Sequence, residues 1–253
     1  MRRVPRAVLA LAACLPGVAA GLTLLLCARG VQSPVVLPRP AAPRSAPPYQ
    51  APQPPIRPRS AWLDATVRRT QPPPRYDDAV VAVFVHHTDS PNDYTCATTP
   101  EVIRRLYAGQ TTGRHWDDIG YNFLVDRCGT IYEGRAGGIE RAVTGAHAQG
   151  FNHRTAGIAA IGTFTAGIPV PRAMTDAIAA LTAWKLGLAG VDPRAGTRLV
   201  SSNGRSRYPV GAVAALPAVS GHDAGFPTSC PGAALTAKLP DIRNTAARLQ
   251  GRR

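Results

Sequence analysis

One seven-residue stretch restricts the fold more than any other part of the chain. Residues 79–85 read AVVAVFV, an apolar run without a charge, and two histidines follow it directly. A strand that faces water on one side alternates polar and apolar residues, whereas a continuous apolar run of this length is typical of a strand covered on both faces. We therefore expect a central β-sheet with helices packed against it.

Patterns elsewhere in the domain alternate between strand and helix, as this arrangement requires. Further strands are predicted at residues 121–126, 130–133 and 156–161, the first two joined by a hairpin turn. Helices are predicted at residues 100–108, 171–188 and 233–249. Residues 201–210 look like a loop insertion. The predicted fold class is α/β, with a single mixed central β-sheet flanked by helices.

The first thirty residues have the pattern of a targeting segment. Three arginines precede an uncharged, mostly apolar run at residues 7–28. This pattern is typical of a secretory signal, and the run is also long enough to span a bilayer. Residues 1–30 are therefore predicted to be a signal peptide or an N-terminal membrane anchor. Either choice implies a secreted or cell-envelope protein outside the cytoplasm.

A spacer and one globular domain follow this segment. Residues 31–58 contain ten prolines, with alanine, arginine and serine between them. Such a composition buries too little apolar surface to offset its ordering entropy, and proline keeps it extended. We predict a Pro/Ala-rich linker at 31–58 and a single domain at 59–253, a suitable length for one core. A monomer is expected.

The distribution of charge along the chain argues against a nucleic-acid partner. The formal charge is +14, but residues 1–60 carry eight arginines and no acid. The remainder holds 21 basic against 15 acidic residues. The excess therefore lies mostly in the targeting segment and linker, without the aromatic residues on which bases stack. A serine hydrolase is also excluded, because the chain has no G-x-S-x-G motif.

Three residues have side chains suited to a metal. His86 follows the predicted buried strand, and His222 and Cys230 lie in the loop sequence SGHDAGFPTSCPG. Two imidazoles and a thiolate would give zinc three protein ligands and leave a fourth position open. The alternative is a pair of core histidines with an unrelated cysteine. Because side chains alternate along a strand, at most one of His86 and His87 is expected to face a given site.

The remaining cysteines of the domain bear on this choice. Cys96 and Cys128 are candidates for a disulfide in an exported protein. That pairing leaves Cys230 without a partner, and an odd cysteine in a secreted chain indicates a reactive thiol or a ligand. The count therefore favours zinc.

Residues 79–241 resemble the peptidoglycan recognition proteins and the related zinc-dependent N-acetylmuramoyl-L-alanine amidases. The resemblance rests on motifs in the family's order: FVHHT (84–88), WDDIGYNFLVD (116–126), GTIYEGRAGG (129–138), GAHAQGFN (145–152) and TSCPG (228–232). Upstream of this range, PRSAW (58–62) also matches. Arginine usage, the N-terminal segment and the Pro/Ala linker resemble the actinobacterial members.

The resemblance implies roles for individual residues. The family's zinc ligands fall on His86, His222 and Cys230. Its active-site tyrosine falls on Tyr121, and Thr228 occupies a position held by threonine or lysine in active members. The implied reaction is hydrolysis of the amide between N-acetylmuramic acid and L-alanine, with zinc activating a water molecule and hydroxyl groups donating to the oxyanion.

Several of these residues also have an alternative role that is purely structural. Tyr121 could be a packing aromatic, and Thr228 could satisfy backbone groups in a turn. Substrate contacts are predicted for five residues near the implied groove. For two of them, a surface arginine and a tryptophan in the core are ordinary alternatives; these are Arg135 and Trp116. These five are His87, Trp116, Arg135, His147 and Asn152.

Two functions from different classes remain after these steps. The first is a zinc amidase acting on peptidoglycan, with the glycan strand and stem peptide as partner. The second is a non-catalytic peptidoglycan-binding module of the same fold. Non-catalytic members of the family typically lack the cysteine ligand, so the presence of Cys230 favours the enzyme.

Overall fold

The computed structural model describes residues 48–64 and 71–253. The predicted targeting segment, residues 1–30, and most of the predicted linker lie outside these residues. The described residues belong to one compact unit, Ala46–Arg253. None of the helices in this part of the chain is long and apolar enough to cross a membrane.

A mixed six-stranded sheet forms the centre of the domain, in the order β1-β4-β3-β5-β2-β8. The strands are β1 (Ile56–Arg57), β2 (Ala82–His87), β3 (Phe123–Val125), β4 (Ile131–Glu133), β5 (Thr155–Ala160) and β8 (Val219–Gly221). Only the β3–β4 pair is antiparallel; the other neighbours run parallel. The predicted fold class is confirmed, and β2 is the strand expected at residues 79–85.

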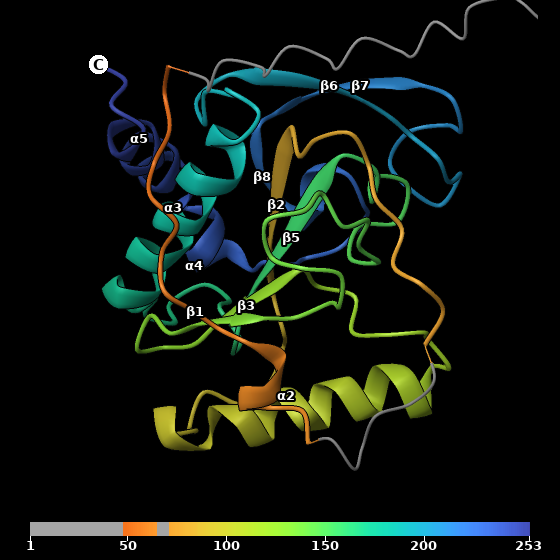
Figure 1. Cartoon of the computed structure of the whole chain (residues 1–253), viewed down its shortest axis with the longest axis vertical. Helices are drawn as coiled ribbons and strands as arrows, with labels where there is room; N and C mark the ends of the chain where they lie inside the picture. The colour runs from red at the N-terminus through yellow and green to blue at the C-terminus, as the bar shows by residue number, and fades with distance from the viewer. Residues whose placement is uncertain (1–47, 65–70) are drawn as a thin grey trace, which may run out of the picture. The chain divides into compact units, whose positions relative to one another are not determined.

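Helices cover both faces of this sheet (Figure 1). The helices are α2 (Thr99–Ala108), α3 (Arg172–Gly187), α4 (Ala233–Thr236) and α5 (Leu239–Leu249), and α2 continues as a π-helical turn at Gly109–Gly113. Val83 and Val85 of β2 pack in one cluster with residues of α3 and α5. Helix α2 packs on the other face, where Ile103 and Tyr107 join a second cluster. This division follows from the alternation of side chains along each strand.

Two element boundaries differ from the sequence prediction. The helix expected at 233–249 is interrupted between Thr236 and Leu239. Pro240 lies in the first turn of α5, where its missing N–H is tolerated, but it could not have continued a preceding helix. Strand β2 extends through His86 and His87, which pair with β5. Both histidines are thus the last residues of the strand rather than the residues after it.

The central sheet includes residues from the segment that the sequence assigned to the linker. Ile56 and Arg57, assigned above to the linker at 31–58, form β1 and pair in parallel with β4. Ala51 is buried against Ala183 and Ala246 of α3 and α5. A two-residue strand carries no detectable period, so the prolines around it dominated the sequence pattern.

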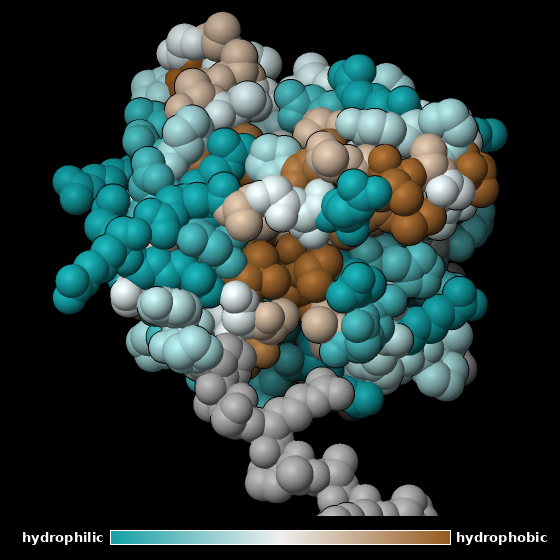
Figure 2. Space-filling view, turned by 90° about the horizontal axis from the view of Figure 1, so that it is seen from above, coloured by the Kyte–Doolittle hydropathy of each residue, from teal (hydrophilic) through white to brown (hydrophobic). Residues whose placement is uncertain are grey.

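A separate two-stranded sheet lies on the face of β2 that carries Phe84. It consists of β6 (Gly196–Val200) and β7 (Val213–Pro217), with residues 201–212 as the connecting loop. Leu199 and Leu216 pack inward against Phe84. Val200 and Val213 form a cross-strand pair that faces outward. The side chain of Val200 is 59% exposed and that of Val213 is 50% exposed. Figure 2 looks onto this side of the molecule and shows hydrophobic surface among hydrophilic side chains.

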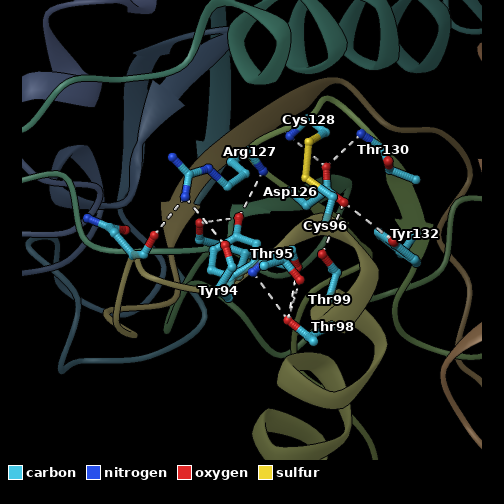
Figure 3. The surroundings of a disulfide bond; sticks show 12 residues. Tyr94, Thr95, Cys96, Thr98, Thr99, Asp126, Arg127, Cys128, Thr130 and Tyr132 are labelled. Atoms are coloured by element: carbon cyan, nitrogen blue, oxygen red, sulfur yellow. Dashed lines mark hydrogen bonds between the residues drawn. A yellow bond between two sulfur atoms is a disulfide. The ribbon is translucent and has the colours of Figure 1, made fainter.

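A disulfide joins Cys96, just before α2, to Cys128 in the turn between β3 and β4 (Figure 3). This confirms the predicted pairing. The buried carboxylate of Asp126 stabilises the same turn, because it accepts hydrogen bonds from the backbone of Cys128 and from the hydroxyl of Thr99. The N-terminus of α2 is therefore attached to the sheet both covalently and through Asp126.

Candidate active site

The three predicted metal ligands come together at the end of β2. His86 is fully buried on this strand, on the same face as Phe84. His222 begins a short 3₁₀ turn directly after β8, which is the neighbour of β2 in the sheet. Cys230 approaches from the loop before α4. Parallel neighbours end at the same edge of a sheet, so the two histidines are brought side by side although 136 positions separate them.

The donor atoms of this group are close enough for one ion. One ligand atom from each of His86, His222 and Cys230 lies within 4.8 Å of the others. Cys230 Sγ is 3.8 Å from His86 Nδ1, and the two imidazole centroids are 4.4 Å apart. The backbone N–H of His87 donates to Cys230 Sγ at 3.3 Å. A thiolate at this position would keep that hydrogen bond.

Burial sets the protonation of all three side chains. It holds the pKa of His86 well below its usual value and lowers the pKa of His222 to about 4. Both rings are thus neutral at physiological pH, as metal ligation requires. Burial also raises the pKa of the Cys230 thiol to about 12. A bound cation would have to displace this proton, which metals do for coordinating thiols.

The group fits zinc. Among the described residues, His222 Nε2 is one of two buried side-chain polar atoms without a hydrogen-bond partner. A buried nitrogen without a partner costs free energy unless something binds it. Two imidazole nitrogens and one sulfur are the donors that zinc prefers, and three protein ligands leave a fourth position free for substrate or water. His86, His222 and Cys230 would hold the ion.

Family membership follows from a comparison with known proteins. A family profile described as N-acetylmuramoyl-L-alanine amidase matches residues 76–233, which contain all three side chains of this group. The chain belongs to the N-acetylmuramoyl-L-alanine amidase family.

Relatives of this amidase-family chain include recognition proteins and enzymes. A peptidoglycan-recognition protein of Drosophila melanogaster is 36% identical over 114 residues, 45% of this chain and 59% of that protein. The N-acetylmuramoyl-L-alanine amidase of Mus musculus is 34% identical over 121 residues, 46% of this chain and 21% of that protein. The chain thus spans less than two thirds of these relatives. Both are animal proteins, so they do not support the expected actinobacterial resemblance.

A solved structure shares the fold. A Drosophila PGRP-LB variant in complex with tracheal cytotoxin is 25% identical, with a TM-score of 0.55. The match covers 73% of this chain and 92% of that chain. The sheet and helices described above therefore form the fold of the peptidoglycan recognition proteins and type 2 amidases.

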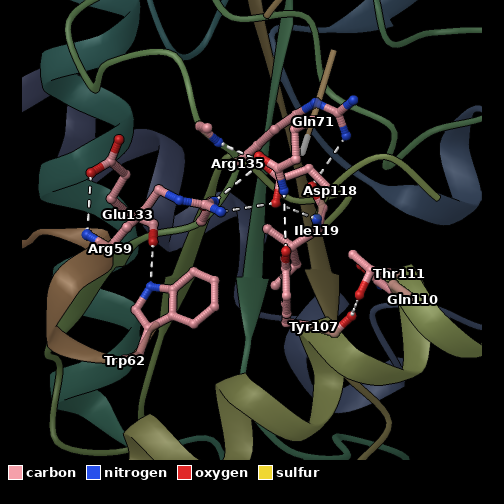
Figure 4. Close-up of polar contacts among 12 residues, drawn as sticks. Arg59, Trp62, Gln71, Tyr107, Gln110, Thr111, Asp118, Ile119, Glu133 and Arg135 are labelled. Carbon is pink, nitrogen blue, oxygen red and sulfur yellow. Dashed lines mark hydrogen bonds and ion pairs between the residues drawn. The ribbon is translucent and has the colours of Figure 1, made fainter. Parts of the chain in front are cut away.

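The candidate metal ligands His86, His222 and Cys230 are called the ligand group below. Tyr121 lies against this group. Its ring centroid is 5.2 Å from that of His86. Burial, followed by the neighbouring Cys230, raises the pKa of its hydroxyl, which therefore remains protonated and able to donate. The loop that carries it is held by Asp118, whose buried carboxylate pairs with Arg59 and accepts the backbone N–H of Ala136 (Figure 4). Arg59 thus supports the loop of Tyr121 through its ion pair with Asp118.

Thr228 is adjacent to the ligand group but is engaged in its turn. Its hydroxyl oxygen accepts the backbone N–H of Cys230 at 3.2 Å. This is the backbone-satisfying role that sequence reasoning kept as the alternative. The hydroxyl proton is not used by that bond, so Thr228 retains one donor.

The structure separates the predicted substrate contacts into inner and outer residues. His147 is 7% exposed, and its Nδ1 lies 3.1 Å from His86 Nε2. Asn152 Oδ1 accepts the backbone N–H groups of His147 and Ala148. His87 Nδ1 accepts the backbone N–H of Phe164. His87 leaves β2 on the face opposite His86, as alternation predicted.

Trp116 and Arg135 lie nearer the surface. Trp116 is 36% exposed, and the guanidinium of Arg114 lies over its ring. Arg135 donates to the backbone carbonyl of Ile119 and lines a polar cavity of about 270 Å³ together with Asn152. An apolar cavity of about 400 Å³ lies next to the end of β2, between Thr88 and α2. The predicted substrate contacts of these residues stay predictions.

One contact in the site was not anticipated. Sequence reasoning assigned His147 to the groove and gave no role to Thr155, yet both lie within hydrogen-bond distance in a row that starts at His86. The GAHAQGFN motif indicated that His147 matters. The direction in which its ring points depends on strand pairing, which the motif does not encode.

Proposed function

We propose that this chain is a zinc-dependent N-acetylmuramoyl-L-alanine amidase, which hydrolyses the amide bond between N-acetylmuramic acid and L-alanine in bacterial peptidoglycan. The observation that carries the proposal is the convergence of His86, His222 and Cys230, with donor atoms within 4.8 Å of one another. A buried imidazole nitrogen without a partner is difficult to explain in a domain that only binds.

The residues around the ligand group have the chemistry that amide hydrolysis needs. When bound, zinc would supply Lewis-acid polarisation and lower the pKa of water from 15.7 toward about 7. Tyr121 keeps its proton and can donate a hydrogen bond to an oxyanion. Thr228 retains a second hydroxyl donor beside Cys230. Removing one such donor typically costs about 100-fold or more in kcat.

The relatives support peptidoglycan as the substrate. One curated relative is named an N-acetylmuramoyl-L-alanine amidase, and a structural relative is described as a complex with tracheal cytotoxin. Another structural relative, peptidoglycan recognition protein-LE, is described in complex with tracheal cytotoxin, a monomeric diaminopimelic acid-type peptidoglycan. By analogy, this chain would bind a glycan strand with its stem peptide at the edge of the sheet that carries the ligand group.

The second candidate is a peptidoglycan-binding module of the same fold without hydrolytic activity. Several relatives are named only as recognition proteins. The complete donor set favours the enzyme, because a binding module has no need of a buried thiol beside two neutral imidazoles.

Mass spectrometry of purified muropeptides incubated with the purified protein would test the proposal. Free glycan and intact stem peptide should appear, and a zinc chelator should abolish them. Cys230→Ala should be inactive, whereas Ser229→Ala, a change at the exposed neighbouring residue, should retain activity. Zinc binding without cleavage would favour the binding module, and cleavage within the peptide or between sugars would contradict the mechanism.

We also propose that the protein acts outside the cytoplasm, as an exported monomer or through an N-terminal membrane attachment. The support is the arginine-flanked apolar run at residues 7–28. Fractionation of expressing cells, with N-terminal sequencing of the recovered protein, would test this. Recovery in the cytoplasm with Met1 retained would contradict it.

A further inference from the structure

Behind the ligand group, a row of buried side chains connects His86 to the backbone. His86 Nε2 lies 3.1 Å from His147 Nδ1. His147 Nε2 lies 3.3 Å from the hydroxyl of Thr155, and that hydroxyl contacts the carbonyl oxygen of Phe151 at 2.6 Å. His86, His147 and Thr155 are all at most 7% exposed. Water therefore does not compete with these contacts.

The far end of the row determines where each proton lies. A carbonyl oxygen only accepts, so Thr155 donates its single proton to Phe151. Its oxygen can then only accept from His147, which places the His147 proton on Nε2. A neutral imidazole has one N–H and one lone pair, so His147 Nδ1 carries the lone pair and accepts from His86 Nε2–H.

The same reasoning extends to the metal-facing side of His86. A buried neutral imidazole with its proton on Nε2 has an unprotonated Nδ1. Nδ1 is the atom that lies 3.8 Å from Cys230 Sγ. In the other tautomer, a proton would occupy the position where a metal must bind.

We propose that His147 and Thr155 are positioning residues that hold His86 in the Nε2–H tautomer and so direct its Nδ1 lone pair toward the metal. The inference rests on the proposed function, since the lone pair serves catalysis only if a metal binds there. Ligating histidines generally use their second nitrogen in this way. Here the acceptor is another histidine, whose own tautomer is set by a threonine.

Neighbouring residues keep the ring of His147 in place. Asn152 Oδ1 accepts the backbone N–H of His147 at 2.8 Å. The ring lies directly over Gly157 of β5, where an added Cβ would lie 2.3 Å from His147 Cγ. Only glycine leaves room for the ring at this position. Strand β5, which pairs with the strand of His86, thus leaves space for the ring of His147 at Gly157.

Nitrogen-15 NMR of the histidine side chains in the zinc-free protein tests the tautomers directly. We expect His86 and His147 each to carry a proton on Nε2 and a lone pair on Nδ1. A proton on His86 Nδ1 would overturn the inference. This measurement needs no zinc. Correct tautomers in a protein that fails to bind zinc would support this hydrogen-bond chain and contradict the proposed function instead.

Substitutions at Thr155 test the coupling to the metal. Thr155→Val keeps the shape but removes the hydroxyl, so His86 should populate both tautomers and zinc affinity, measured by chelator competition, should fall about 10-fold or more. Thr155→Ser, which keeps the hydroxyl, should have the wild-type tautomer of His86 and the wild-type zinc affinity. Thr182→Val is the matched control, because Thr182 is a buried threonine whose hydroxyl has no partner among the described residues; it should change zinc affinity less than twofold.

Two outcomes of this series would refute the inference. The first is a folded Thr155→Val protein with wild-type zinc affinity and an unchanged His86 tautomer. The second is a failure of Thr155→Ser to restore affinity, which would indicate that the site responds to packing and not to the hydroxyl. His147→Phe, which removes the acceptor itself, should lower zinc affinity by about 10–100-fold.

Discussion

Zinc binding to this domain should release one proton per ion between pH 5.0 and 6.5. The thiol of Cys230, whose pKa burial raises to about 12, is protonated throughout this range in the zinc-free protein. His222, with its pKa lowered to about 4, and His86, whose pKa burial holds well below its usual value, are already neutral. Only the thiol then has a proton to lose when it becomes a ligand.

The size of the effect follows from this count. Release of one proton makes the zinc affinity rise tenfold per pH unit, or about 30-fold over the range, which is about 2 kcal/mol of binding free energy. Histidines with an ordinary pKa near 6.5 would each add almost one proton at pH 5. The affinity would then change nearly a thousandfold for each pH unit near the acid end.

Competition with a chromophoric chelator at several pH values measures the slope, and calorimetry in two buffers of different ionisation enthalpy counts the protons independently. Cys230→Ala should bind zinc more weakly, with almost no pH dependence in this range. A release approaching three protons at pH 5 would refute the claim that burial keeps the two imidazoles neutral. A release of none in the wild-type protein would show that Cys230 is not a ligand.

Three further predictions concern the scaffold, each measured by urea denaturation. Replacing Cys96 and Cys128 together by serine should lower the free energy of unfolding by roughly 3–4 kcal/mol, the value for a closed loop of about this length; an unchanged stability would contradict it. Asp118→Ala should cost about 3–5 kcal/mol because it leaves the largely buried Arg59 without its ion pair, and a loss below 1 kcal/mol would indicate that water replaces the carboxylate. Tyr94→Phe removes a hydroxyl that donates to one backbone carbonyl and accepts one backbone N–H, and it should cost about 1–3 kcal/mol.

The residues that sequence patterns located best are those whose chemistry or periodicity is local. The apolar run at 79–85 predicted β2 because burial on both faces removes polar residues from a strand. The helix at 100–108 was predicted within one residue, since Pro100 and Glu101 mark its first turn. His86, His222 and Cys230 could be selected because few residue types bind metals.

What sequence patterns missed depends on pairing between distant segments. Strand β1 is stabilised by its parallel partner Ile131–Tyr132, and nothing within its own two residues distinguishes it from the proline-rich sequence around it. The contact between His86 and His147 spans 61 positions and requires β2 and β5 to pair in one register. A shift of that register by one residue would turn His86 to the other face of the sheet.

The order of the cysteines along the chain has a consequence for biogenesis. Cys96 and Cys128 close a disulfide across 32 positions, whereas the free Cys230 follows both. A chain is synthesised from its N-terminus, so the segment containing both disulfide partners is complete before Cys230 exists. If Cys96 and Cys128 are oxidised early, neither is available to form a disulfide with Cys230. This order along the chain favours pairing of Cys96 with Cys128 and leaves the thiol of Cys230 reduced, as the proposed metal ligation requires.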